Sequence, residues 1–437
     1  MRILVAIAVT LLTAVPARAR TWSLSECIDY ALENNITVRQ NTLSVQQREN
    51  DLNTARNRRL PGVSAGASQN ISFGRGLTAD NTYANTNTAS TSFSLGADMT
   101  IFQGFAIKNN IAASRLNLEA ATADLEKARD DIRVSVAQAY VQILYNKEIL
   151  QVAENQIKVD SLQVERLTAM MDNGKASQAE VSAQKSTLAR SVLSRTQAQN
   201  TLNLSVLDLT QLLELESPEG FDVEVPETDA FETGLFTNPE EIYAEAVAIK
   251  PSVRSELIRL ENAETSIRMA KGNYLPSLSL NGGLGSNYYV ASGRPSDSFG
   301  TQLNNNFSQY LGLSLSIPVF SRMSNRNGVR SAQLSYLNQQ LQLDGVRKSL
   351  YKEIQQAYYS AVASEAKYIS SMAAETSALE SFQITEAKYE SGMASITEFN
   401  ESKGRWIEAA SNLAQARYEY LYQTKLLDFY RGEKLSF

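Results

Sequence analysis

The sequence contains no histidine and only one cysteine, Cys27, among its 437 residues. A disulfide within the chain is therefore excluded, and histidine cannot serve as a catalytic base or a metal ligand. No glycine-rich phosphate loop follows a predicted strand, and paired carboxylates occur only on predicted helices. We therefore predict that the protein is not an enzyme, and we expect no cofactor and no bound metal.

A long apolar run is also missing. The apolar residues 3–15 are too few to cross a bilayer as a helix. Because Arg2 precedes them and the small-x-small residues 17–19 follow, we predict a secretory signal peptide over residues 1–19. A lipid anchor at Cys27 is disfavoured, because the charged Glu26 precedes it where a small residue is needed. We instead expect Cys27 on the buried face of the first helix.

The charge pattern limits the partners. The net charge of −6 is spread along the chain, which argues against nucleic acid. No later stretch has the apolar length of a spanning helix, so any part of the chain within a membrane must consist of β-strands.

Proline is absent from residues 321–390, and the stretch contains only two glycines, Gly328 and Gly345. Apolar side chains recur at helical spacing, which predicts a helix roughly 100 Å long. Residues 103–172 form a second stretch of this kind, with apolar residues alternately three and four apart, as in a coiled coil. These two stretches end at Gly392 and Gly174, and helices are predicted to follow over about 394–431 and 176–213.

Four shorter segments alternate apolar residues with Ser, Gly, Asn or Thr, the pattern of β-strands with one apolar face. They cover about 62–73, 92–102, 277–289 and 309–320. The polar segment 74–91 connects the first two strands and the polar segment 291–307 connects the last two. Both are predicted to be loops, so the strands form two hairpins.

The order of these elements occurs twice. Leu275-Pro276 parallels Leu60-Pro61 at a shift of 275 − 60 = 215, and Gly392 parallels Gly174 at 392 − 174 = 218. We predict a first repeat over 20–213, an irregular link over 214–240 and a second repeat over 241–437.

The strands suit a membrane, because ten to twelve residues cross a bilayer and aromatic residues gather at the strand ends. Four strands cannot close a barrel, so several chains must share one. Symmetry permits two, three or four chains, and only twelve or sixteen strands would leave water inside.

Four features point to a known family: the doubled helix–hairpin–helix order, the two Leu-Pro pairs, Val319-Phe320 before the second long helix, and Tyr389-x-x-Gly392-x-x-Ser395. In these features the chain resembles the TolC family of outer-membrane efflux proteins. It implies a mainly α fold: a duplicated unit that forms a trimeric α-helical tunnel, capped by a shared twelve-stranded barrel in the outer membrane. It also implies an equatorial domain, formed by the link 214–240 and the chain's last residues, and a tunnel that extends into the periplasm. The implied partners are a periplasmic adaptor, an inner-membrane pump and outer-membrane lipid.

The resemblance also implies candidate sites. Glu398 and Glu401 match acidic positions that ring the closed periplasmic entrance, and we expect Ile396 and Phe399 to help hold that closure. The family's arginine after the turn is here Ala394, so its locking ion pair with Glu180 of the other repeat cannot form. Exposed turns for adaptor docking are expected at Gly174, Lys175, Ala176, Ser177, Gly392, Met393, Ala394 and Ser395.

The predicted function is passive export of drugs or other small molecules through an exit duct. Within the same fold, type I protein secretion or metal-ion export is the alternative, although the lack of histidine weakens metal export. A trimeric surface adhesin is the competing class, but its four strands lie together at the C-terminus, whereas here they form two separate hairpins.

Overall fold

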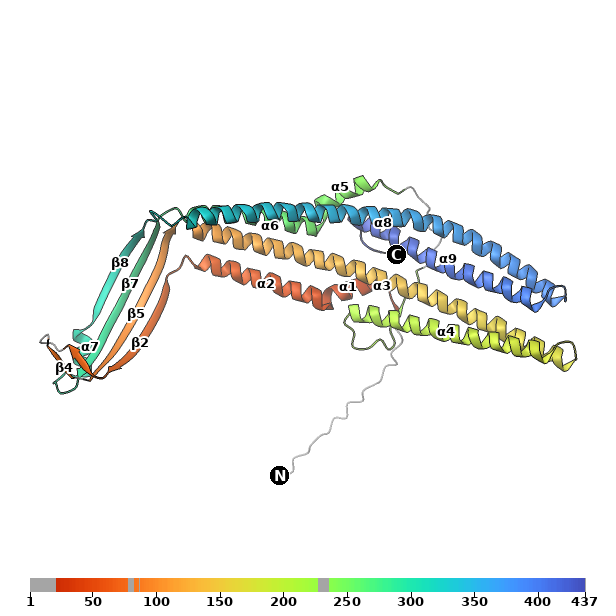
Figure 1. Ribbon diagram of the computed structural model, residues 1–437, viewed down its shortest axis with the longest axis horizontal. Helices are drawn as coiled ribbons and strands as arrows, with labels where there is room; N and C mark the ends of the chain where they lie inside the picture. The colour runs from red at the N-terminus through yellow and green to blue at the C-terminus, as the bar shows by residue number, and fades with distance from the viewer. Residues whose placement is uncertain (1–20, 78–81, 86, 227–235, 437) are drawn as a thin grey trace, which may run out of the picture. The chain divides into compact units, whose positions relative to one another are not determined.

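The computed structural model describes residues 21–77, 82–85, 87–226 and 236–436 (Figure 1). The predicted signal peptide lies outside these residues. The chain divides into two compact units, which we call the helical unit and the sheet unit. The helical unit comprises the described residues of Met1–Thr42, Leu125–Pro251 and Arg347–Phe437, and the sheet unit comprises those of Leu43–Asp124 and Ser252–Val346.

The sheet unit contains four antiparallel strands in the order β2-β5-β7-β8. They are β2 (Gly62–Ser72), β5 (Thr88–Gln103), β7 (Ser277–Ala291) and β8 (Ser308–Ser316). The register places Leu95 opposite Leu284, and Leu280 opposite Leu313, so apolar side chains gather on one face. The first strand of one hairpin and the last strand of the other are therefore the edges of the sheet.

The loops and strand ends differ from the prediction in three places. β8 ends at Ser316 rather than near residue 320, because Pro318 has no N–H for the ladder. The first loop contains the short strands β3 (Arg75–Leu77) and β4 (Tyr83–Asn85). The second contains helix α7 (Phe299–Asn305), which begins where the Ser298 hydroxyl accepts a hydrogen bond from the Thr301 N–H.

Helices adjoin the strands of the sheet unit: α2 (Ile36–Asn57), α3 (Ala106–Asp172), α6 (Pro251–Gly272) and α8 (Ser324–Glu390). The boundary between the units falls within α2, α3 and α8. Inside the sheet unit, Arg259 pairs with Asp124 at 2.5 Å, which joins α6 to α3.

The helical unit also contains α1 (Leu24–Asn34), α4 (Gln178–Leu212), α5 (Pro239–Ile249) and α9 (Ile396–Tyr430). Strands β1 (Thr21–Trp22) and β6 (Asp222–Val223) pair in parallel, and the Tyr140 hydroxyl donates to the Glu224 carbonyl at 2.6 Å. Cys27 is fully buried on α1, as expected. Within the described ranges, none of the helices combines the length and apolarity needed to cross a bilayer.

Candidate functional site at the helix-hairpin tips

Two helix–turn–helix corners form the tips of the helical unit, one between α3 and α4 and one between α8 and α9 (Figure 1). At the first, Gly174 has φ +69°, its N–H donates to the Met171 carbonyl at 2.9 Å, and the Lys175 N–H donates to the Met170 carbonyl at 2.8 Å. This is the Schellman arrangement, in which glycine adopts the left-handed conformation.

The second tip repeats the first in detail. Gly392 has φ +75°, its N–H donates to the Tyr389 carbonyl at 3.1 Å, and the Met393 N–H donates to the Lys388 carbonyl at 2.8 Å. Both positions need glycine because of the left-handed backbone conformation. Lack of room for a side chain is not the reason, because open space surrounds the position where each would carry a Cβ.

Two of the three candidate gate glutamates cap the helices that follow these turns. The Glu180 carboxylate accepts from the N–H and hydroxyl of Ser177 at 2.6 and 2.8 Å, and Glu398 does the same with Ser395 at 2.7 and 2.9 Å. The pKa values of both carboxyls are lowered, first by the backbone hydrogen bond and then by the serine hydroxyl. Each glutamate therefore closes a capping box, a role that requires no neighbouring chain.

Glu401 lies one turn further along α9 and is exposed, with its side chain outside the cap. Of the two acidic positions that follow the second turn, Glu401 is thus the one whose carboxylate is not already bound by its own helix start.

The predicted docking residues are arranged as small, accessible corners. The eight residues form the two turns and the helix caps that follow them, and seven of them are small or polar. Met393 is the exception, and its large apolar side chain is three-quarters exposed. Ala176 and Ala394 are half-buried, and the other named residues of both turns are exposed.

Phe399 does not face an opening. Its side chain is fully buried within the hairpin, where its ring centroid lies 5.5 Å from that of Phe382 and 5.1 Å from that of Tyr389. Phe382 in turn stacks on Trp406 at 5.3 Å. The expectation that Phe399 helps to close an entrance is therefore wrong for this conformation, because it packs the core that joins α8 to α9.

A buried ion pair that the sequence analysis missed connects the two hairpins. Lys403 of α9 pairs with Asp160 of α3, and their side chains are only 3% and 0% exposed. Asp160 also accepts from the Ser191 hydroxyl at 2.5 Å and from the Gln184 amide at 3.3 Å. The Asn400 amide donates to Gln184 at 3.4 Å and extends the network along α9. We call this set of five residues the buried polar network.

A sequence signal for the network does exist. Asp160 occupies the seam position between Ile157 and Val164, where the three–four spacing calls for an apolar residue. A charged residue there requires a buried partner, since an unpaired charge in a core is costly.

Arg166 forms a second link between the hairpins, nearer the tips. Its guanidinium lies 3.3 Å from the Glu390 carboxylate, donates to the Glu390 carbonyl at 3.1 Å, and sits 5.1 Å from the centre of the Tyr389 ring. The turn after α8 is thus fastened to α3, within one chain and without an arginine at position 394.

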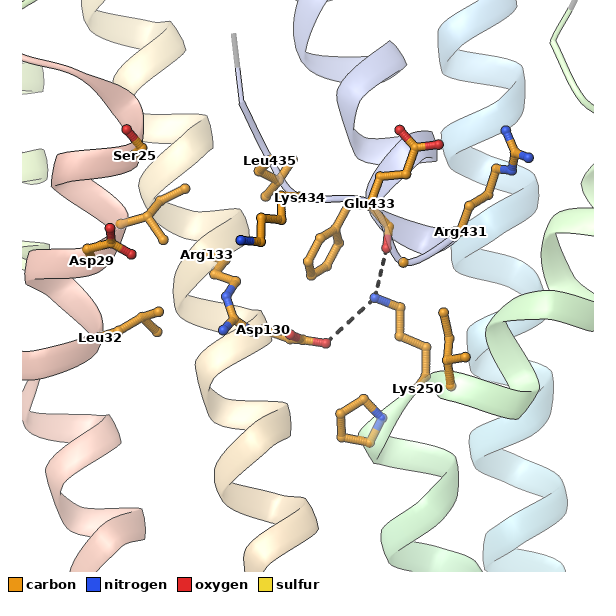
Figure 2. A pocket seen from close by; sticks show the side chains of 15 residues that line it. Ser25, Asp29, Leu32, Asp130, Arg133, Lys250, Arg431, Glu433, Lys434 and Leu435 are labelled. Carbon is orange, nitrogen blue, oxygen red and sulfur yellow. Dashed lines mark hydrogen bonds and ion pairs between the residues drawn. The ribbon is translucent and has the colours of Figure 1, made fainter.

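A cavity of about 700 Å³ lies elsewhere in the helical unit, where α1, α3, the end of α5 and the C-terminal residues meet (Figure 2). The Lys250 ammonium lies 3.6 Å from the Asp130 carboxylate, donates to the Phe429 carbonyl at 3.2 Å and sits 3.7 Å from the centre of the Phe429 ring. Burial lowers the pKa of Lys250, and Asp130 opposes that shift. Arg133 forms an ion pair with the same aspartate at 2.7 Å. Asp130 is thus neutralised by Lys250 and Arg133 of the same chain, and these contacts hold the end of α5 against α3 and α9.

Comparison with solved structures shows the fold. The chain resembles the Campylobacter jejuni CmeC outer membrane channel with a TM-score of 0.79 at 18% identity, covering 93% of this chain and 84% of that one. The open state of the Neisseria gonorrhoeae MtrE outer membrane channel matches with a TM-score of 0.75 at 18% identity, over 94% and 88% of the two chains. The fold is that of the TolC-type channels.

The family follows from the sequence. The Outer membrane efflux protein family matches residues 27–214 and 242–433, and the chain belongs to it. The outer membrane protein TolC of Salmonella enteritidis is 22% identical over 374 residues, covering 85% of this chain and 74% of that protein. The protein is an efflux duct of the outer membrane, and its relatives are outer-membrane channels.

Proposed function

We propose that three copies of this chain form one passive exit duct for small molecules in a tripartite pump. The duct would take its cargo from an inner-membrane pump and a periplasmic adaptor and release it outside the cell, with no catalytic step and no cofactor. The observation that carries the proposal is a four-stranded sheet with two open edges and an exposed apolar face.

The open edges require partner strands. Within a bilayer, each unpaired backbone N–H or C=O costs several kcal/mol, so an open sheet is not stable there. Pairing β8 of one copy with β2 of the next satisfies both edges at once. Three copies give 3 × 4 = 12 strands, enough for a water-filled lumen.

The two faces of the sheet suit this arrangement. The apolar face carries exposed side chains, among them Val63, Leu95, Leu284, Leu311, Leu313 and Leu315, with Leu311 80% exposed. The opposite face carries Ser64, Gly96, Asn281 and Gly283, small or polar residues that would line a wet interior. This is the alternation of a membrane barrel.

The tips supply the proposed contacts with the adaptor. Residues 174–177 and 392–395 form two small-residue corners of the same construction, and small side chains let another helical hairpin approach closely. We further propose that Glu401, together with Glu398 and Glu180, contributes to a ring of carboxylates at the periplasmic entrance. Three copies would place Glu398 and Glu401 as six carboxylates around the axis, a charge pattern that favours cations.

Disulfide cross-linking between edge strands tests the proposal. In a Cys27→Ser background, one cysteine is placed at Ala67 on β2 and a second at Gln309, Leu311 or Leu313 on β8, all four positions lying on the apolar face of the sheet. Two strands separate these positions within one copy, roughly 14 Å at the usual strand spacing, so no disulfide can form inside a chain.

Oxidation in membranes should yield a covalently closed trimer in at least one register of the series. Absence of cross-links in every register would overturn the shared barrel. Cargo is tested separately by dye accumulation in a duct-deficient host that expresses this chain with its own adaptor and pump. Restored dye efflux supports small-molecule export, whereas restored secretion of a protein substrate alone would favour the type I alternative.

A further inference from the structure

Basic residues gather where the four strands of the sheet unit meet their helices. All four junctions lie at one end of the sheet, because β2 and β7 begin there and β5 and β8 end there (Figure 1). The residues around the junctions are 52–62, 103–118, 265–277 and 317–333. These segments contain ten lysines and arginines and no aspartate or glutamate: Arg56, Arg58, Arg59, Lys108, Arg115, Arg268, Lys271, Arg322, Arg326 and Arg330. We call these ten residues the basic collar.

The collar is available to a partner. All ten side chains are exposed, and among the described residues only Arg268 has an ion pair, with Glu264 at 3.4 Å. Elsewhere in the same unit, arginines such as Arg48 and Arg259 are paired with carboxylates. Asp98 of β5 lies opposite Gly62 and Glu264 pairs with Arg268, but ten cations outnumber these two carboxylates, so the collar is a net positive surface in a chain whose net charge is −6.

The opposite end of the sheet provides an internal comparison. Its loop segments 73–87 and 291–307 contain Arg75 and Arg294 against Asp80 and Asp297, a net charge of zero. The excess of positive charge is thus confined to the helix-side end.

Exposed apolar and aromatic side chains border the collar. Val319 and Phe320 are 94% and 75% exposed, and Leu60, Phe105, Tyr274 and Met323 are also largely exposed. Exposing so many large apolar side chains to water in one band is unfavourable. Side chains of this kind beside cations match the boundary of a bilayer, where rings sit at headgroup level and arginines extend toward the phosphates.

The backbone holds this band in a defined geometry. Gly104 and Phe105 at one junction, and Arg322 and Met323 at the repeated one, have φ values of +52°, +63°, +51° and +66°. At the first junction a Cβ on Gly104 would lie 2.0 Å from the Gly272 carbonyl oxygen, so that contact requires glycine. The left-handed residues at these two junctions thus fix the path of the chain where the apolar band and the collar meet.

We propose that the basic collar binds the headgroups of anionic phospholipids in the leaflet that faces the periplasm. The inference rests on the proposed arrangement, with the sheet in the membrane and the helices in the periplasm. A cation near an anionic membrane surface contributes roughly fivefold in binding, and the effect falls off within a Debye length. Three copies would present thirty cations as a closed ring, so the lipid annulus there would be enriched in anionic species.

Lipid selection by the purified trimer tests the proposal. The protein is incubated in neutral detergent with equal amounts of phosphatidylethanolamine and phosphatidylglycerol, separated by size exclusion, and its bound lipids are quantified. The wild type should retain the anionic lipid in severalfold excess at low salt, and the excess should shrink as salt shortens the Debye length.

Three variants separate charge from structure. R58Q/R59Q/R326Q/R330Q should bring the lipid ratio close to one; Arg322 is left unchanged because of its positive φ. The corresponding four Arg→Lys changes should keep the excess, since the charge remains. The control K158Q/K185Q/K348Q/K352Q removes four exposed charges from the helical unit and should behave as the wild type.

The proposal is overturned if the wild type shows no salt-sensitive preference, an outcome that does not depend on any variant folding. It is also overturned if the collar variant keeps the preference or the control loses it. The trimer mass and channel conductance of the same samples report the proposed duct. A conducting trimer without lipid preference would therefore refute the collar and leave the duct intact.

Discussion

Replacing Lys403 by methionine is expected to loosen the helical unit more than any surface charge change. Methionine keeps most of the side-chain volume but removes the ammonium that neutralises Asp160. The carboxylate would then be buried with only the Ser191 hydroxyl and the Gln184 amide as partners.

The magnitude follows from burial. Removing one member of a fully buried pair costs about 3–5 kcal/mol, because the remaining charge is left without compensation. Removing both charges, as in D160L/K403M, costs much less, about 1–3 kcal/mol for the polar groups left unpaired. A double-mutant cycle should therefore show strong coupling between the two positions.

Hydrogen exchange of the amides of α9 measures this directly, because it reports the local opening free energy. A loss of about 3 kcal/mol corresponds to more than a hundredfold loss of protection. The exposed pair Lys367–Glu419, at 2.8 Å and 42% exposure on each side, joins α8 to α9 and provides the matched control. Its disruption should cost less than about 1 kcal/mol.

The buried pair does not stabilise α9 as expected if K403M changes protection no more than K367M does. The same conclusion follows if the double variant is as unstable as the sum of the two single variants, because the pair would then carry no mutual stabilisation.

Three further predictions concern the gate, the caps and the topology. Replacing Glu398 and Glu401 by alanine should lower cation selectivity and weaken block by trivalent cations in planar bilayers, because the proposed ring attracts cations. Ser395→Ala should cost α9 about 1 kcal/mol, seen as faster exchange of its first-turn amides. Because the pKa of Glu398 is lowered below its ordinary 4.5, its capping contribution is present above that value and disappears as pH falls through the lowered pKa. Cysteines at Asn85 and Asn304 should react with an impermeant label on intact cells, since both lie in proposed outer loops.

Each of these predictions has a defined contrary result. Wild-type selectivity in the double glutamate variant would show that no carboxylate ring exists. Glu380 and Glu408 are exposed controls, whereas Glu375 is unsuitable because it accepts from the Trp406 indole N–H at 3.0 Å. Unchanged first-turn exchange in Ser395→Ala, or pH-independent exchange after correction for the intrinsic rate, would remove the capping argument. Labelling only after lysis would invert the proposed topology.

The helices and their turns were predictable because their signals are local. The long helices of the structure begin within about three residues of the expected positions and end at the expected ones, since Gly174 and Gly392 need a left-handed backbone and Ser177 and Ser395 supply caps. The strands were likewise visible as alternation. Helix α7 was missed because its Ser298 cap lies within a polar loop without apolar periodicity, and its Phe299 packs on Tyr288 of another segment.

The residues that join the hairpins could not be paired from the sequence. Asp160 stands out at an apolar seam position, but Lys403 lies 243 positions away, and nothing local identifies it as the partner until the packing of α3 against α9 is known. The capping role of Glu398 follows from the local motif Ser395-x-x-Glu398, whereas its expected place in a gate rests on the family resemblance alone.

In the proposed duct, this chain is one of three identical copies. Native mass spectrometry of the mature protein in detergent, without any cross-linker, measures this directly. A single species with the mass of three chains is the predicted result. A stable monomer, or a dimer as the largest assembly, would contradict the account, because the edges of β2 and β8 would then have no partners.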